Sequence, residues 1–135
     1  MVKKKQSLNE TSTVIVDEEA DVTPNEEDQA FTNLSQTLAE IRKETGVIGY
    51  ILRSNTSATI DLKKPEKIVE YALFSSQVLD SSREISETFK LDAIENVLIE
   101  GKEAKALCMN IDEVNISVFM EKNADHADIL KKVSP

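Results

Sequence analysis

The alternation of apolar and polar residues predicts helices and strands from residue 31 onward. Residues 31–41 place apolar side chains at steps of three and four, which puts them on one face of a helix. Residues 47–53 (VIGYILR) are nearly continuously apolar and β-rich, which is typical of a strand covered on both faces. Residues 54–57 predict a turn, and residues 58–62 alternate as a second strand. The two strands are therefore predicted to form a hairpin.

A long helix is predicted to begin after Pro65 and to run over residues 66–89. Its serines at 75, 82 and 86 lie on the apolar side, where a sheet could approach closely. Val69 and Leu73 instead project from the charged side, one turn apart. They are either ordinary isolated surface residues or part of a surface for a partner, and the sequence leaves both interpretations open. The predicted core stripe consists of Ile68, Tyr71, Ala72, Phe74, Val78, Leu79, Ile85 and Phe89.

The last third of the chain predicts a β-meander and a short helix. Residues 92–100, 104–111 and 114–121 read as three strands joined by two short turns. Asp125 can cap a final helix. Five strands with helices for both faces make an α/β sandwich, in which the strand at 47–53 lies in the middle. The strand from Asp92 is predicted to be a free edge, which invites pairing with another chain.

Residues 1–30 are predicted to be a disordered acidic tail, so that the folded domain comprises residues 31–135. The tail is mostly polar and has too little apolar surface to offset the entropy of ordering. Its exception is Val14-Ile15-Val16, which is followed by Asp17-Glu18-Glu19. A β-branched triplet beside acids could add as a strand to a partner's sheet edge, and it resembles the short motifs that bind ubiquitin-like modifiers. The simpler interpretation is a chance apolar triplet in a solvated tail.

The charge balance limits the classes of partner. The chain has 135 residues, with 25 acidic against 16 basic side chains and a formal net charge of −9 at pH 7. This excess argues against a nucleic-acid partner, which needs clustered Lys and Arg. No apolar run approaches the roughly 18 residues of a membrane span, and no apolar segment follows the basic N-terminal residues as in a signal peptide. We therefore expect a soluble, cytoplasmic, single-domain protein without membrane insertion.

No segment carries a catalytic or cofactor-binding signature. Gly46, Gly49 and Gly101 do not have the spacing of a phosphate-binding loop. Cys108 would need a base such as His126 to act as a nucleophile, but its place between apolar strand residues is typical of a core thiol, and His126 is expected to be solvated. The acidic pairs lie in the tail or in turns, without metal-loop spacing. We expect no catalytic residue, no metal and no cofactor, and hence a non-enzymatic protein.

The residues from Leu34 to Val133 resemble the Roadblock / dynein light chain family. The likeness lies in residues 46–53 (GVIGYILR), in the polar turn and serine-bearing long helix that follow, and in the strands and short helix at the end. The chain departs from the family at Asn55-Thr56, where Asp-Gly or Asn-Gly is usual. The resemblance implies a roadblock (profilin-like) sandwich with a five-stranded, mostly antiparallel sheet, helices on both faces and the element order α-β-β-α-β-β-β-α.

The resemblance also implies an interface. Family members form dimers in which the long helix and the third strand, an edge, meet their counterparts, so that two five-stranded sheets become one. They act as non-enzymatic platforms, commonly for Ras-like small GTPases or within motor and lysosomal signalling assemblies. By position, the dimer or partner interface would here comprise Val69, Leu73, Ser76, Asp80, Ile94, Asn96, Leu98 and Glu100.

Three classes of function follow. The leading expectation is a homodimeric scaffold, or one paired with a related Roadblock subunit, that binds and regulates a Ras-like small GTPase. The alternative is a purely structural dimeric subunit of a larger motor or signalling assembly. A small-ligand sensor is the third class, and it would need a cavity beneath the long helix. Some relatives accelerate GTP hydrolysis, but Arg42, Arg53 and Arg83 are interpreted as surface arginines without that role.

Overall fold

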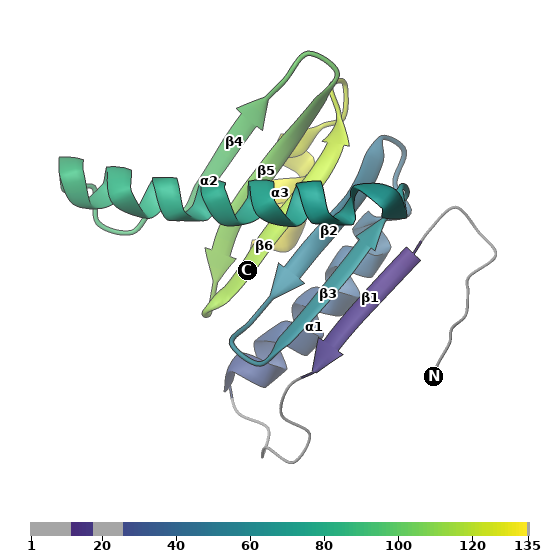
Figure 1. Cartoon of the computed structure of the whole chain (residues 1–135), viewed down its shortest axis with the longest axis horizontal. Coiled ribbons are helices and arrows are strands. Elements are labelled where there is room, and N and C mark those ends of the chain that lie inside the picture. The colour runs from purple at the N-terminus through teal and green to yellow at the C-terminus, as the bar shows by residue number, and fades with distance from the viewer. Residues whose placement is uncertain (1–11, 18–25, 135) are drawn as a thin grey trace.

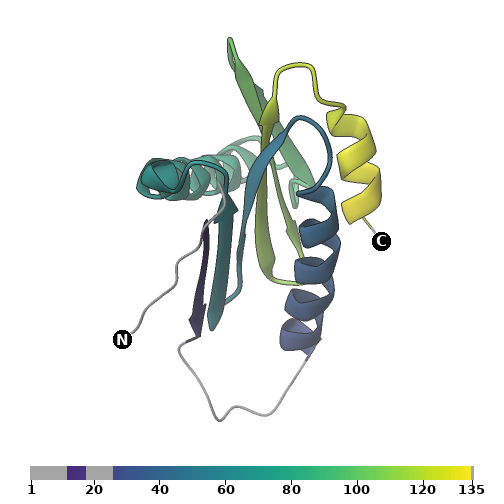
Figure 2. The same cartoon turned by 90° about the vertical axis from the view of Figure 1, so that its right-hand side faces the viewer.

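The computed structural model describes residues 12–17 and 26–134 (Figure 1). The described residues form a six-stranded antiparallel sheet in the order β1-β3-β2-β6-β5-β4. Helices α1 and α3 cover one face of the sheet, and α2 crosses the other (Figure 2). The elements are β1 (Ser12–Asp17), α1 (Glu26–Ile41), β2 (Val47–Arg53), β3 (Ser57–Leu62), a 3-10 turn (Pro65–Lys67), α2 (Ile68–Phe89), β4 (Asn96–Glu100), β5 (Ala104–Ile111), β6 (Val114–Glu121) and α3 (His126–Val133).

The α/β architecture is confirmed, with an antiparallel sheet between helices on both faces. β2 lies between β3 and β6, as its apolar character on both faces predicts. β4 ends the sheet, as predicted for the strand after the long helix, although it begins at Asn96 rather than Asp92. The reason is local: Lys90 and Asp92 both have left-handed backbone conformations, with φ of 57° and 62°, which turn the chain before the strand can start.

The N-terminal residues differ from the sequence expectation. Residues 12–17 form β1 instead of belonging to a tail, and α1 begins at Glu26 instead of Phe31. β1 pairs with β3 over its whole length, from Ser12 opposite Leu62 to Asp17 opposite Ser57. A continuous backbone ladder with an existing sheet supplies the hydrogen bonds that the segment lacks on its own, which sequence periodicity does not reveal. The rest of the predicted tail, residues 1–11 and 18–25, lies outside the described residues.

The larger part of the core lies between the sheet and the α1–α3 layer. Leu38 and Ile41 of α1 and Ile129 and Val133 of α3 are buried against it. Asp125 caps α3, since its side chain accepts a hydrogen bond from the Asp128 amide at 3.1 Å. The sheet contributes Val47, Tyr50, Leu52, Leu107, Met109, Val114, Ile116, Val118 and Met120 to this cluster.

On the other face, the first half of α2 rests on β6. The ring of Tyr71 stacks on that of Phe119, with centroids 4.5 Å apart, and Phe74 contacts the same ring at 6.1 Å. Ser75 and Ser117 are both buried and hydrogen-bond through their hydroxyls. The small side chain of Ser75 therefore lets the helix approach the sheet closely, as its place on the apolar side predicts.

Gly49 makes a second close approach possible, in the centre of β2. A Cβ atom at this position would lie 2.3 Å from the carbonyl oxygen of Asp61 on β3. Any side chain would therefore push β3 away from β2, which explains a glycine within an otherwise apolar strand.

Candidate functional site

β4 is an open edge of the sheet. In the described part of the chain it pairs with β5 alone, so the backbone groups on its outer side are unpaired by any strand. Neither Lys nor Pro interrupts its sequence, NVLIE, and edges without such residues pair readily with other strands. The predicted interface residues Asn96 and Glu100 are exposed here, and Leu98 is half-buried against the α1–α3 cluster. Ile94 is half-buried in the segment before the strand.

The second half of α2 projects beyond this edge (Figure 1). Ile85 and Phe89, which the sequence assigns to the core, are 49% and 68% exposed, and Leu91 beyond the helix end is exposed as well. Ile85 follows Phe74 by about three turns and Phe89 follows Tyr71 by about five, so they continue the stripe that rests on Phe119. The core assignment is wrong for these two residues because the sheet ends before the helix does. We call Ile85, Phe89 and Leu91 the overhang.

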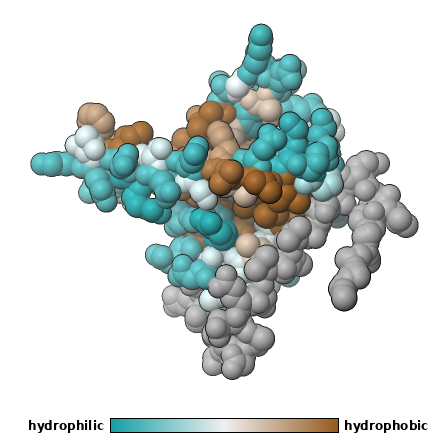
Figure 3. All heavy atoms as spheres, in the orientation of Figure 1, coloured by the Kyte–Doolittle hydropathy of each residue, from teal (hydrophilic) through white to brown (hydrophobic). Residues whose placement is uncertain are grey.

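An apolar groove lies beside α2, at the turn between β4 and β5. It has a volume of about 350 Å³, and its apolar walls are Tyr71, Phe74, Ile99, Ala106 and Phe119. Apolar surface is visible both at the free end of α2 and along its middle (Figure 3). Ile99 is exposed at the open side of the groove. The groove could not be predicted from the sequence. The apolar residues of β4 do not show how much of the α2 side of the strand the helix covers.

The four predicted helix residues lie elsewhere on α2. Val69 and Leu73 are 69% and 61% exposed, Asp80 is exposed and Ser76 is half-buried. Their positions around the helix turn them away from the sheet, and Val69 and Leu73 lie in the half of α2 that rests on β6. The structure therefore does not bring them together with the predicted residues of β4. Val69, Leu73, Ser76 and Asp80 form what we call the outer face of α2.

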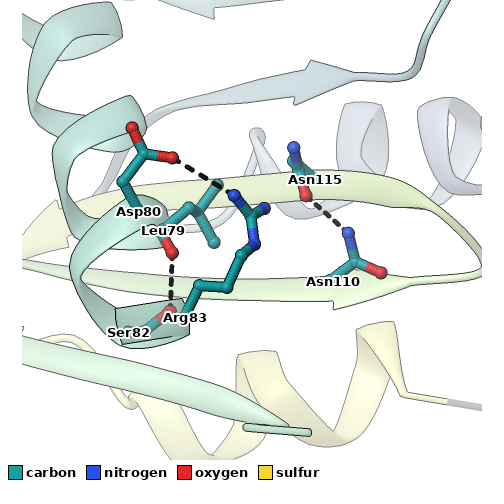
Figure 4. Close-up of polar contacts among 6 residues, drawn as sticks. All are labelled: Leu79, Asp80, Ser82, Arg83, Asn110 and Asn115. Atoms are coloured by element: carbon teal, nitrogen blue, oxygen red, sulfur yellow. Dashed lines mark hydrogen bonds and ion pairs between the residues drawn. The ribbon is translucent and has the colours of Figure 1, made fainter. Parts of the chain in front are cut away.

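A cavity of about 330 Å³ lies beside the second half of α2. Its walls are partly apolar, with Leu79, Val97 and Met109, and partly polar, with Arg83, Asn110 and Asn115, which Figure 4 shows. Arg83 reaches from the helix toward Asn110 and Asn115 and forms an ion pair with Asp80, with Nη1 3.4 Å from Oδ1. Asn110 donates a hydrogen bond to Asn115. Arg83 and the two asparagines thus have polar partners within the protein itself.

Cys108 and His126 lie on opposite faces of the sheet and do not contact one another. Cys108 is buried on the α2 side, where Ser117 donates a hydrogen bond to its sulfur at 3.3 Å. Burial raises the pKa of its thiol, against the smaller opposite effect of that hydrogen bond. His126 is half-buried rather than solvated, and its Nδ1 lies 3.0 Å from Nζ of Lys105 on the α3 side. These positions do not form a nucleophile and base pair.

Arg42 is a structural residue, in contrast to the surface position expected for it. Its Nε lies 3.5 Å from Oδ1 of Asp61, and both side chains are largely buried. Burial raises the pKa of the Asp61 carboxyl, and the charge of Arg42 acts in the opposite direction. Burial likewise raises the pKa of Tyr50, which pairs with Asp61 across β2 and β3. The cluster joins the end of α1 to the sheet.

Among residues 12–17 and 26–134, no three or more His, Cys, Asp or Glu side chains are grouped to hold a metal ion. No helix in this part of the chain has the length and apolarity to cross a membrane. Comparisons with protein-family models and with curated proteins find no match.

Proposed function

We propose that this protein is a non-enzymatic scaffold that forms a homodimer through β4 and α2 and docks a Ras-like small GTPase. The observation that carries the dimer is the overhang. The apolar stripe that packs on the sheet in the first half of α2 continues into the last turns of the helix, where Ile85 and Phe89 are exposed. Exposed apolar surface of this kind, next to an unpaired strand edge, favours association.

A second copy paired antiparallel along β4 supplies the missing sheet. The two-fold axis of such a pair stands perpendicular to the sheet, so the partner's β4 and β5 continue it on the side where α2 projects. From Arg83 to Phe89 the helix advances about 9 Å. Two strand spacings are about 9.6 Å. The overhang therefore has the length to lie over two strands of the partner.

The same symmetry places the partner's helix beside the apolar groove. α2 passes the beginning of β4, since Arg83 and Ser86 line one cavity together with Asn96 and Val97. The two-fold axis passes nearer the middle of β4, at about Leu98. Rotation about it moves α2 to the side of the β4–β5 turn, where the groove between Phe74 and Ile99 is open. Each overhang can then enter the groove of the other copy.

The outer face of α2 stays accessible in this arrangement. Leu73 and Val69 point away from the sheet and are distant from the two-fold axis, so they are available to a third protein. Exposed aliphatic side chains on a helix are suited to a protein partner rather than to a small ligand. The nature of that partner, a Ras-like small GTPase, is supported by the resemblance of residues 34–133 to the Roadblock / dynein light chain family.

Affinity capture at defined nucleotide state tests this function. Tagged protein is incubated with lysate of its own source in GDP or in a non-hydrolysable GTP analogue, and any small GTPase retained is purified and its binding measured. We expect binding that differs at least tenfold between the two nucleotides and that Leu73→Glu weakens, while Leu73→Glu leaves the dimer intact. A stoichiometric complex that is the same in both nucleotides and contains no GTPase would instead indicate a structural subunit and would refute the proposal.

A further inference from the structure

The edge of the sheet opposite β4 is covered by β1. The register is continuous from Ser12 opposite Leu62 to Asp17 opposite Ser57, without a bulge. On its other side, β3 pairs with β2 over Ala58–Leu62, also without a bulge. β3 would therefore be a regular and fully formed edge if β1 were absent.

β3 has no protection of its own against pairing. Its sequence, SATIDL, contains no Lys, Arg or Pro. Its single charged residue, Asp61, is held by Arg42 on the α1 side and does not stand in the path of an incoming strand. Edges of soluble proteins are usually blocked by such residues or by a covering segment. In this chain the covering segment is β1.

We propose that the edge of β3 is a second strand-addition site, which takes an extended segment of the type of residues 12–17 and is normally occupied by β1 of the same chain. The inference rests on the proposed function only in naming β4 as the first site. With β1 in place, the outward backbone groups of β3 are used by β1, and β1 becomes the last strand on this side of the sheet. Without β1, β3 becomes the last strand, and its outward backbone groups are open to an extended segment from outside the chain.

The sequence of β1 fits this role. Val14, Ile15 and Val16 are β-branched residues, which favour extended backbone, and none of residues 12–17 is Pro or Gly. The segment is joined to α1 by residues 18–25, so the segment and its site belong to one chain and meet at an effective concentration of about millimolar or higher. A free peptide must compete with β1 at this effective concentration for the edge of β3. In a chain without β1, the peptide has no such competitor.

The test compares the full chain with a variant that lacks residues 1–20. A fluorescently labelled peptide of residues 9–20 is titrated into each, with a control peptide that carries Val14→Pro and Ile15→Pro. Adjacent residues of a strand point their N–H groups to opposite sides, so one of the two prolines removes a donor to β3. We expect the peptide to bind the truncated variant at least tenfold more tightly than the full chain, and the proline peptide to bind neither.

The same titration in a Phe89→Ser background separates this inference from the proposed dimer. The peptide should bind the truncated Phe89→Ser variant as tightly as the truncated parent, because it uses β3 and not β4. The inference is overturned if the truncated variant, folded by circular dichroism, does not bind the peptide more tightly than the full chain does.

Discussion

The substitution Phe89→Ser should weaken the dimer strongly without unfolding the monomer. An exposed phenylalanine presents about 200 Å² of surface. In this chain 68% of Phe89 is exposed, which leaves about 140 Å² in each copy for a partner to cover. If half of that area is buried on association, the contribution is about 1.7 kcal/mol per copy at about 25 cal/mol per Å².

Two-fold symmetry counts this contribution twice, for about 3.5 kcal/mol, which corresponds to roughly a 300-fold increase in Kd. Sedimentation equilibrium over a concentration series measures the change. Leu73→Ser is the matched control, because Leu73 is 61% exposed on the same helix but lies on its outer face. It should change Kd by less than about twofold.

Two results would refute this reasoning. One is a Phe89→Ser variant that dimerises as tightly as the parent chain, and the other is a Leu73→Ser variant that loses as much affinity as Phe89→Ser. Thermal unfolding of both variants at low concentration checks that the monomer is intact, since neither side chain is buried in it.

Three further predictions concern the interior. Arg42→Gln removes the charge that opposes burial at Asp61, so the pKa of that carboxyl should rise further above its ordinary value. The folded state then favours the protonated carboxyl more than the unfolded chain does. The free energy of unfolding, measured by urea titration, should therefore fall more steeply with pH in the variant than in the parent between about pH 3 and 7. The same pH dependence in both proteins would contradict this. Because burial raises the pKa of Cys108 and covers its sulfur, a thiol reagent at about pH 8 should modify the folded chain at least about 100-fold more slowly than the urea-unfolded chain, and similar rates would be inconsistent with a core thiol. Ser75→Val places bulk between α2 and Ser117 and should lower the free energy of unfolding by about 1–3 kcal/mol, against less for Ser75→Ala; a neutral Ser75→Val would show that the contact is not tight.

The order and type of the elements after residue 31 could be predicted because their periodicity is local. The continuous apolar run of β2 indicates directly that both of its faces are covered. The alternation in β6 identifies its α1–α3 face, whereas the burial of Ser117 and Phe119 on the other face depends on α2. Asp125 was identifiable as a cap for the same reason, since capping depends on residues within one turn.

The overhang could not be predicted from periodicity, which identifies an apolar face but not what covers it. Ile85 and Phe89 have the helical phase of core residues, although no sheet lies beneath them. One signal was present: the 22 residues of α2 span about 33 Å, whereas the four spacings across five strands span only about 19 Å. A helix that crosses such a sheet must extend beyond it.

The position of β1 depends on a partner distant in the sequence. Three apolar residues within a polar segment give a weak signal on their own, and the ladder with β3 joins residues 40 to 50 positions apart. The predicted interface was divided for a similar reason. Leu73 projects from the outer face of α2, whereas Leu98 packs against the α1–α3 cluster on the other face of the sheet, and only the tertiary arrangement sets these two places.

Hydrogen exchange of the backbone amides of β4 tests the central proposal most directly. Exchange is followed by NMR for Asn96–Glu100 at protein concentrations well above and well below the Kd of self-association. Pairing of two β4 edges predicts that the outward-facing amides of this strand exchange slowly at high concentration and rapidly at low concentration. Exchange of these amides at the same rapid rate throughout the series would contradict the paired edge.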